Sequence, residues 1–359
     1  MNFSYKFPAV KGHQAGNDYY ITMIPMGLLS KLFVNNGSDI VLPEFRAQRK
    51  LNEQRIPEIT NYILDNRNSY VFSALSASID GKFEFIPNDK MEELGVLEVD
   101  MNAVFLINDG QHRKAAIDKA ILEDPTLEKE TISIVLFKDE GLKRSQQMFT
   151  DLNKHAVKTS NSISTLYDGR DKIGVATSNI INKILFFNMF TDKEKDNLGK
   201  NSSKLFTLNN LYKANKKIIK GEFSEEDEEF LFNYWKIISE NIVEWKEVMN
   251  KELTKKSLRE DYIITLAVTI MAFGKLGSFL YENREYKLED YLPRIKNINW
   301  SRTNDYWKNS IIREDGKVQN NEDASLIASI KIKSLIDLPL TKEELKKIKG
   351  ITYGKISRI

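Results

Sequence analysis

One stretch indicates the fold of this chain: Ala103-Val104-Phe105-Leu106-Ile107-Asn108-Asp109-Gly110-Gln111-His112-Arg113-Lys114-Ala115-Ala116-Ile117. Residues 103–107 form an apolar run that predicts a buried strand, and residues 114–117 are typical of a helix. The five residues from Asp109 to Arg113 therefore occupy a strand-to-helix turn. Turns of this kind stand at the edge of α/β sheets, where the free N–H groups of a helix N-terminus attract anions.

Two interpretations of this turn are open. In the first, Asp109 caps the helix, Gly110 permits a tight turn, and the last two side chains are solvated. In the second, the turn is a phosphate or nucleotide site, with Gly110, Gln111, His112 and Arg113 as its binding residues. Asp109 would then hold a metal ion or act as a base, so that Asp109, His112 and Arg113 are the candidate catalytic residues.

A second polar cluster follows, at residues 149–155. Asn153 ends a predicted helix, where asparagine is a common C-cap. Alternatively, Asp151, Asn153 and His155 face the Asp109–Arg113 turn, which adds Asn153 to the candidate cofactor-binding residues. In that case Lys158, Ser160 and Ser162 are further candidates for phosphate contact.

A third cluster is basic and consists of Arg46, Arg49, Lys50 and Arg55. Such a cluster is usually a solvated helix face, and the alternative is a DNA-binding surface that contacts phosphates. A comparable basic face is formed by Lys213, Lys216, Lys217 and Lys220. The net charge is only +2, from 53 basic and 51 acidic residues, so any DNA binding must come from a local patch.

The composition excludes several kinds of chemistry. The chain has no cysteine, which excludes disulfides, thiol chemistry and a Cys-ligated iron–sulfur cluster. The lack of cysteine fits a reducing cytoplasm, where we expect the protein to reside. Residues 1–6 lack the apolar core of a signal peptide, and the apolar stretch 262–273 is too short to span a membrane. We therefore expect no membrane contact.

The order of predicted elements favours an α+β fold. Strands are expected at 19–24, 96–99, 104–107 and 131–137, helices at 26–33, 51–64 and 142–152, and a hairpin of residues 71–75 and 82–85 around Asp80-Gly81. The second half is predicted to be mainly helical, with capped helices that begin after Ser224 (to about Met249) and after Thr341, and a helix over 258–281. Exposed loops are expected at 192–203 and 304–323. We divide the chain into domains 1–168 and 169–359.

Several segments resemble the DndB family of DNA sulfur modification proteins. Asp109–Arg113 spells DGQHR, the motif that names a domain found in such proteins. The chain is similar to the family in further segments: 7–16 leading into Tyr19-Tyr20, 47–49, 55–59, 70–75, 151–153 and 300–307.

The resemblance implies a role in bacterial DNA phosphorothioation, in which sulfur replaces a non-bridging oxygen of the DNA backbone. It implies a transcriptional regulator that binds the promoter of its own operon and represses the modification genes. It also implies a ParB/sulfiredoxin-like fold for the first domain. Sulfiredoxin-like enzymes carry a cysteine where this chain has Gln111, so thiol chemistry is not expected here.

Three functions therefore remain open. The first is the DNA-binding regulator, expected as a homodimer because paired half-sites multiply affinity. The second is an enzyme, an NTP hydrolase or ParB-like nuclease that uses a nucleoside triphosphate and magnesium at the Asp109–Arg113 turn. The third is an interaction module whose helical half docks onto other DNA modification proteins.

Overall fold

A computed structural model describes residues 3–33, 52–154 and 159–353. The chain forms two compact units, Met1–Val157 and Lys158–Ile359, which we call the sheet unit and the helical unit. The division falls before the expected boundary at residue 168. Helix α5 (Asn161–Tyr167) lies between the two positions and packs against α8 (Leu208–Ile218) of the helical unit.

The sheet unit contains a seven-stranded sheet in the order β4-β5-β1-β2-β7-β3-β6. Its strands are β1 (Ser4–Gln14), β2 (Asn17–Pro25), β3 (Leu75–Asp80), β4 (Phe83–Asn88), β5 (Met91–Asp100), β6 (Val104–Asp109) and β7 (Thr131–Lys138). Neighbouring strands are antiparallel, except β3 and β7, which are parallel. The four strands predicted from single segments are confirmed.

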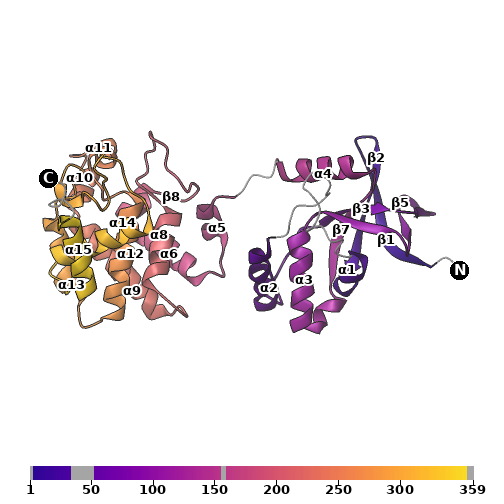
Figure 1. Cartoon of the computed structure of the whole chain (residues 1–359), viewed down its shortest axis with the longest axis horizontal. Helices are drawn as coiled ribbons and strands as arrows, with labels where there is room; N and C mark the ends of the chain where they lie inside the picture. The colour runs from indigo at the N-terminus through magenta and orange to yellow at the C-terminus, as the bar shows by residue number, and fades with distance from the viewer. Residues whose placement is uncertain (1–2, 34–51, 155–158, 354–359) are drawn as a thin grey trace. The chain divides into compact units, whose positions relative to one another are not determined.

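Helices cover the two faces of this sheet unequally (Figure 1). One face packs on α1 (Met26–Leu32), α2 (Ile56–Asp65) and α3 (Gln111–Glu123), with the 3₁₀ turns η2 (Glu53–Arg55) and η3 (Pro125–Lys129). Alternate residues of β7, such as Ile134 and Leu136, enter this core because side chains of a strand alternate between its faces. Helix α4 (Leu142–Lys154) lies on the opposite face, where the Asn108 amide donates to Met148 Sδ at 3.0 Å.

The predicted hairpin around Asp80-Gly81 is wrong. Strand β3 pairs with β6 and β7, whereas β4 pairs with β5 near the other edge of the sheet. Every residue from Leu75 to Ile79 is buried, which fits an inner strand with neighbours on both sides, here β7 and the edge strand β6. The Asp-Gly pair is a local turn signal, but partners far along the chain decide which strands pair.

The helical unit consists of short and medium helices with one small two-stranded sheet. Its elements are α5, α6 (Lys172–Lys183), α7 (Leu185–Phe190), β8 (Thr191–Asp192), β9 (Phe206–Thr207), α8, α9 (Glu225–Asn241), α10 (Val243–Met249), α11 (Lys255–Asp261), α12 (Ala267–Glu282), α13 (Leu288–Tyr291), η4 (Leu292–Asn297), η5 (Asp305–Trp307), α14 (Glu322–Leu335) and α15 (Lys342–Tyr353). An α+β fold with a mainly helical second half is thus confirmed. Among the described residues, no helix combines the length and apolar content needed to cross a membrane.

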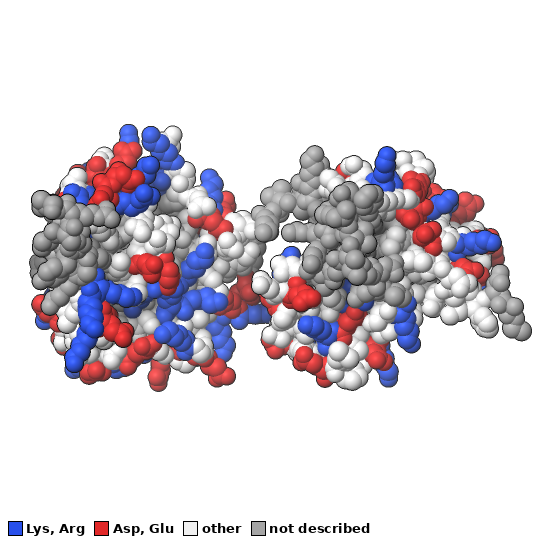
Figure 2. Space-filling view, in the orientation of Figure 1, with Lys and Arg blue, Asp and Glu red and all other residues white. Residues whose placement is uncertain are grey.

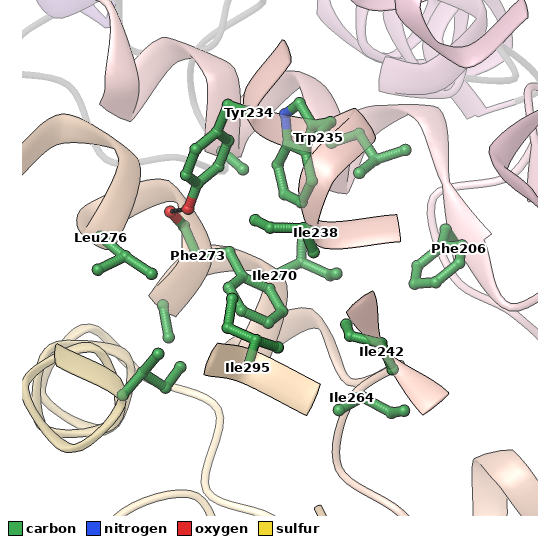
Figure 3. Close-up of a cluster of buried hydrophobic side chains, with 14 of the residues drawn as sticks. Phe206, Tyr234, Trp235, Ile238, Ile242, Ile264, Ile270, Phe273, Leu276 and Ile295 are labelled. Atoms are coloured by element: carbon green, nitrogen blue, oxygen red, sulfur yellow. Dashed lines mark hydrogen bonds between the residues drawn. The ribbon is translucent and has the colours of Figure 1, made fainter. Parts of the chain in front are cut away.

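A large apolar core holds the helical unit together (Figure 3). At its centre the Tyr234 hydroxyl of α9 donates to the Phe273 carbonyl of α12 at 2.6 Å. Helices α8 and α12 approach closely at Gly274, where a Cβ would stand 2.9 Å from Ala214 Cα. A larger residue at 274 would therefore push these two helices apart.

Three predictions for the second half need correction. The helix expected up to Met249 breaks at Ile242, which is extended and fully buried, so that Trp245 stacks on Phe186 at 4.7 Å. The helix expected over 258–281 is interrupted between α11 and α12, because Tyr262 instead forms a bridge with Ser301. The loop 304–323 is not fully exposed, since Trp307, Ile311 and Ile312 are buried. Both predicted capping boxes are confirmed.

Candidate functional site

The DGQHR turn joins β6 to α3 through Gly110, the N-cap residue of α3. Gly110 has φ +103°, a left-handed conformation that favours glycine. A Cβ at this position would also lie 2.3 Å from Leu75 Cδ2. The turn therefore requires glycine for its backbone conformation and for its closeness to β3. No side chain caps α3, so the interpretation of Asp109 as a helix cap does not hold.

Arg113 is the main structural side chain of the turn. Its guanidinium donates to Asp109 Oδ2 at 2.5 Å, to the Ser73 carbonyl at 2.6 Å and hydroxyl at 2.7 Å, and to the Ala74 carbonyl at 2.9 Å. Only 17% of the side chain is exposed. Arg113 thus fastens the segment before β3 to the start of α3.

His112 connects the turn to a distant segment. Its Nε2 accepts the backbone N–H of Asn52 at 3.0 Å, which requires an unprotonated Nε2. The Asn52 side chain in turn caps η2 by accepting the N–H of Gln54 at 3.2 Å. His112 therefore positions the entrance to α2, and a doubly protonated imidazole would lose this bond.

Gln111 differs from its neighbours in the motif. Its amide nitrogen Nε2 is buried and has no hydrogen-bond partner among the described residues. A buried donor without a partner costs about 1–3 kcal/mol. Gln111 therefore has a donor available for a ligand oxygen beside the N-terminus of α3.

Asp109 offers little support for a protein-held metal ion. Its carboxylate is 40% exposed and is paired with Arg113. In the described part of the chain, no group of three or more His, Asp or Glu side chains has the arrangement of a metal site. A magnesium ion at this turn would have to arrive with the phosphates of a nucleotide, as Mg²⁺ commonly does.

The other predicted site residues are only partly placed. Arg46, Arg49, Lys50, His155 and Lys158 lie outside the described residues, as does the side chain of Asn153 in the last turn of α4. Arg55 is described, at the exposed end of η2. Asp151 accepts from Gln147 Nε2 at 2.7 Å within α4.

Two serines proposed as phosphate ligands have structural partners instead. The Ser160 hydroxyl donates to the Glu194 carbonyl and accepts from the N–H of Ile163, capping α5. The Ser162 hydroxyl donates to the Lys195 carbonyl at 2.9 Å. Both hydroxyls therefore attach α5 to the loop 192–203 of its own unit.

A basic cavity in the helical unit was not predicted from the sequence. It has a volume of about 350 Å³, and its cationic lining residues are Lys200, Lys256, Arg259 and Arg302, against the acids Asp196 and Glu260. Ala267 also lines it, at the N-terminus of α12, which has no side-chain cap and adds positive partial charge. The four cations come from three separate segments of the chain, so no local sequence pattern identifies the cavity.

The two arginines of this basic cavity are held in place by the backbone. Arg259 donates to the carbonyls of Gly199, Lys200 and Ser202. Arg302 donates to the carbonyls of Tyr262 and Arg259, and burial lowers the pKa of its guanidinium. Lys200 and Lys256 are exposed and are the residues best able to reach a phosphate. Elsewhere, basic and acidic side chains are intermixed on the visible surface (Figure 2).

On α8, the predicted basic face is partly neutralised. Lys217 pairs with Glu322 at 2.9 Å and Lys220 pairs with Glu282 at 2.8 Å. Lys213 and Lys216 are exposed. The basic cavity is therefore a more concentrated positive site than the face of α8.

These features define a two-unit α+β protein with a DGQHR strand–turn–helix in the sheet unit and a basic cavity in the helical unit. Residues 7–339 match the DndB family, described as DNA-sulfur modification-associated. The chain belongs to this family, and the resemblance inferred from its motifs is confirmed. No curated protein and no solved structure matches the chain.

Proposed function

We propose that this protein is a DNA-binding transcriptional regulator that represses the gene cluster for DNA phosphorothioate modification. Membership of the DndB family, over residues 7–339, carries this proposal and implies a role in the DNA sulfur modification system. The basic cavity supports it, because a near-neutral chain needs a local concentration of positive charge to bind DNA. A homodimer on paired half-sites and docking to other modification proteins belong to the same proposal.

The proposed contact is between the DNA backbone and the basic cavity. Arg259 and Arg302 are fixed by carbonyls and provide a preorganised positive wall. Lys200 and Lys256 extend into solvent and neutralise phosphates, which releases counterions from the DNA. Arg55 and the undescribed cluster of Arg46, Arg49 and Lys50 are proposed as a second contact, on the sheet unit.

A salt-dependent binding assay tests this proposal. Fluorescence anisotropy would compare a labelled duplex from the promoter of the protein's own operon with a random duplex, at several salt concentrations. The double variant Lys200→Glu/Lys256→Glu should bind more weakly, and its slope of log affinity against log salt should fall by about two. Lys236→Glu/Lys287→Glu makes the same charge change at exposed lysines outside the basic cavity and should have a smaller effect. Equal affinity for promoter and random duplex would contradict specific regulation.

Gln111 favours a second candidate, a nucleotide-dependent hydrolase or nuclease. A glycine turn followed by His112 and Arg113 at a helix N-terminus resembles the phosphate-binding turn of the ParB/sulfiredoxin-like superfamily, and we propose this relationship for the sheet unit. Calorimetry with ATP, CTP and GTP, each with magnesium, tests for the site. Gln111→Met keeps the volume but removes the amide, so it should abolish binding, and the melting temperature should not fall because an unpaired buried donor is removed. If the unmodified protein binds none of the three nucleotides, the candidate fails.

A further inference from the structure

The sheet unit has an apolar surface that the proposed function does not use. It lies on the sheet face opposite α1, α2 and α3, the same face on which α4 packs near β6. Over β4, β5, β1 and β2 this face exposes six large apolar side chains: Val10, Ile21, Met23, Ile86, Leu94 and Val96. We call this set the apolar band. Large exposed apolar patches on a soluble protein mark interaction sites.

The strand register places the apolar band in two adjacent rows. In one row Ile86 stands opposite Val96, and Val96 stands opposite Pro8. In the other row Leu94 stands opposite Val10, and Val10 stands opposite Ile21. The rows line a shallow hollow of about 660 Å³. The apolar band is therefore one continuous surface and not a set of scattered side chains.

The dimensions of the apolar band suit a single helix. Strands are about 4.8 Å apart, so the distance from β4 to β7 is roughly 19 Å, and the two rows are about 7 Å apart. At a rise of 1.5 Å per residue, roughly 13 helical residues cover that length, and a helix is about 10 Å wide. Helix α4 packs on the same face of the sheet, against β6.

The charged side chains around the apolar band indicate what kind of partner it would bind. At its β4–β5 end, exposed acids outnumber exposed bases in and beside these two strands, with Glu84, Asp89, Glu92 and Glu93 against Lys82 and Lys90. The further rim residues Lys6 and Glu98 pair with each other. A second copy of this chain would present the same acidic rim and be repelled, because like charges across an interface are unfavourable. A helix with lysine or arginine beside its apolar stripe would be attracted.

We propose that the apolar band is a docking site for a basic amphipathic helix of a partner protein. Binding follows the helix-in-groove mode, in which residues spaced i, i+3, i+4 and i+7 enter the hollow and flanking cations meet the acidic rim. The inference does not depend on DNA binding, because it uses none of the residues of the basic cavity.

A labelled peptide tests this docking site on the 359-residue chain. The probe is a fluorescein-labelled 14-residue peptide of leucine and lysine with leucines at i, i+3, i+4 and i+7, measured by anisotropy. Met23 is 64% exposed within the apolar band, and Met23→Lys should weaken binding by about tenfold or more, which corresponds to about 1.4 kcal/mol. Leu122→Lys makes a similar change on α3, at a side chain 83% exposed outside the apolar band, and should bind like the unmodified protein.

A charge variant and two control peptides show whether binding depends on the acidic rim and on the apolar stripe. Glu92→Lys/Glu93→Lys should weaken peptide binding without altering an apolar side chain. This double variant therefore tests the docking site even if Met23→Lys folds poorly. A peptide with glutamate in place of lysine, and one with the same composition but no apolar stripe, should bind weakly. Equal effects of Met23→Lys and Leu122→Lys would overturn the proposal. So would a dimer in solution that Met23→Lys converts to a monomer, because a second copy would then occupy the apolar band.

Discussion

Gly110 and Arg113 give the DGQHR turn its shape. Gly110 allows the left-handed backbone and the close approach of Leu75, and Arg113 fastens the segment at Ser73. The strand, the turn and the helix were predictable from local sequence. The partners of His112 and Arg113 were not predictable, because Asn52 and Ser73 are far from the motif in sequence and contact it only in the folded sheet unit.

Gly110→Ala should strongly destabilise the sheet unit. The left-handed backbone costs about 1–2 kcal/mol for a residue with a Cβ, and the clash with Leu75 adds roughly 1–3 kcal/mol. Urea denaturation followed by circular dichroism measures the change in the free energy of unfolding. Gly16→Ala is the matched control, since Gly16 has φ +80° but no atom within 4 Å of its Cβ position, so only the strain applies. Equal losses in the two variants would refute the packing role of Gly110.

At the scale of elements, helix α5 depends on a carboxylate from another segment. Asp196 accepts the backbone N–H groups of Asn161 at 2.9 Å and Ser162 at 2.8 Å, where a negative charge favours the helix N-terminus. Burial by itself would raise the pKa of Asp196, but these hydrogen bonds outweigh it and hold the pKa below the usual 3.8. The sequence suggested an exposed loop here and gave no sign of this contact.

The stabilisation from Asp196 should depend on pH. Because its folded pKa is lowered, the stabilisation is complete above the unfolded pKa of about 4 and is lost as the pH falls through the folded value. Asp196→Asn should therefore lower the melting temperature at pH 6, and the difference from the unmodified protein should shrink as the pH falls below 4. Glu194→Gln, an exposed position in the same loop, should show no such change. A difference independent of pH would mean that the charge is unimportant.

At the scale of the whole molecule, the two units have separate cores. The core of the sheet unit extends from Phe7 to Leu136, and that of the helical unit from Ile180 to Leu338. The four tryptophans are Trp235, Trp245, Trp300 and Trp307, all buried in the helical unit. Tryptophan fluorescence therefore reports on the helical unit alone, whereas circular dichroism reports on both.

Denaturation followed by tryptophan fluorescence and by circular dichroism should therefore show separate unfolding transitions for the two units. Gly110→Ala should lower the midpoint of the transition seen by circular dichroism and leave the tryptophan fluorescence midpoint unchanged. Gly274→Val, which forces α8 and α12 apart, should lower the fluorescence midpoint. If Gly110→Ala shifted both midpoints equally, the units would unfold as one cooperative body.

The sequence by itself determined the features that depend on neighbouring residues. Periodicity predicted the α+β class and the strand–turn–helix around Gly110, local hydrogen bonding predicted the caps at Ser224 and Thr341, and the motifs indicated the DndB family. The tertiary structure decided which strands pair, that Arg113 and His112 fasten distant segments, and that the basic cavity and the apolar band exist. These features join residues from separate parts of the chain, and such contacts form only when burial of apolar surface brings those parts together.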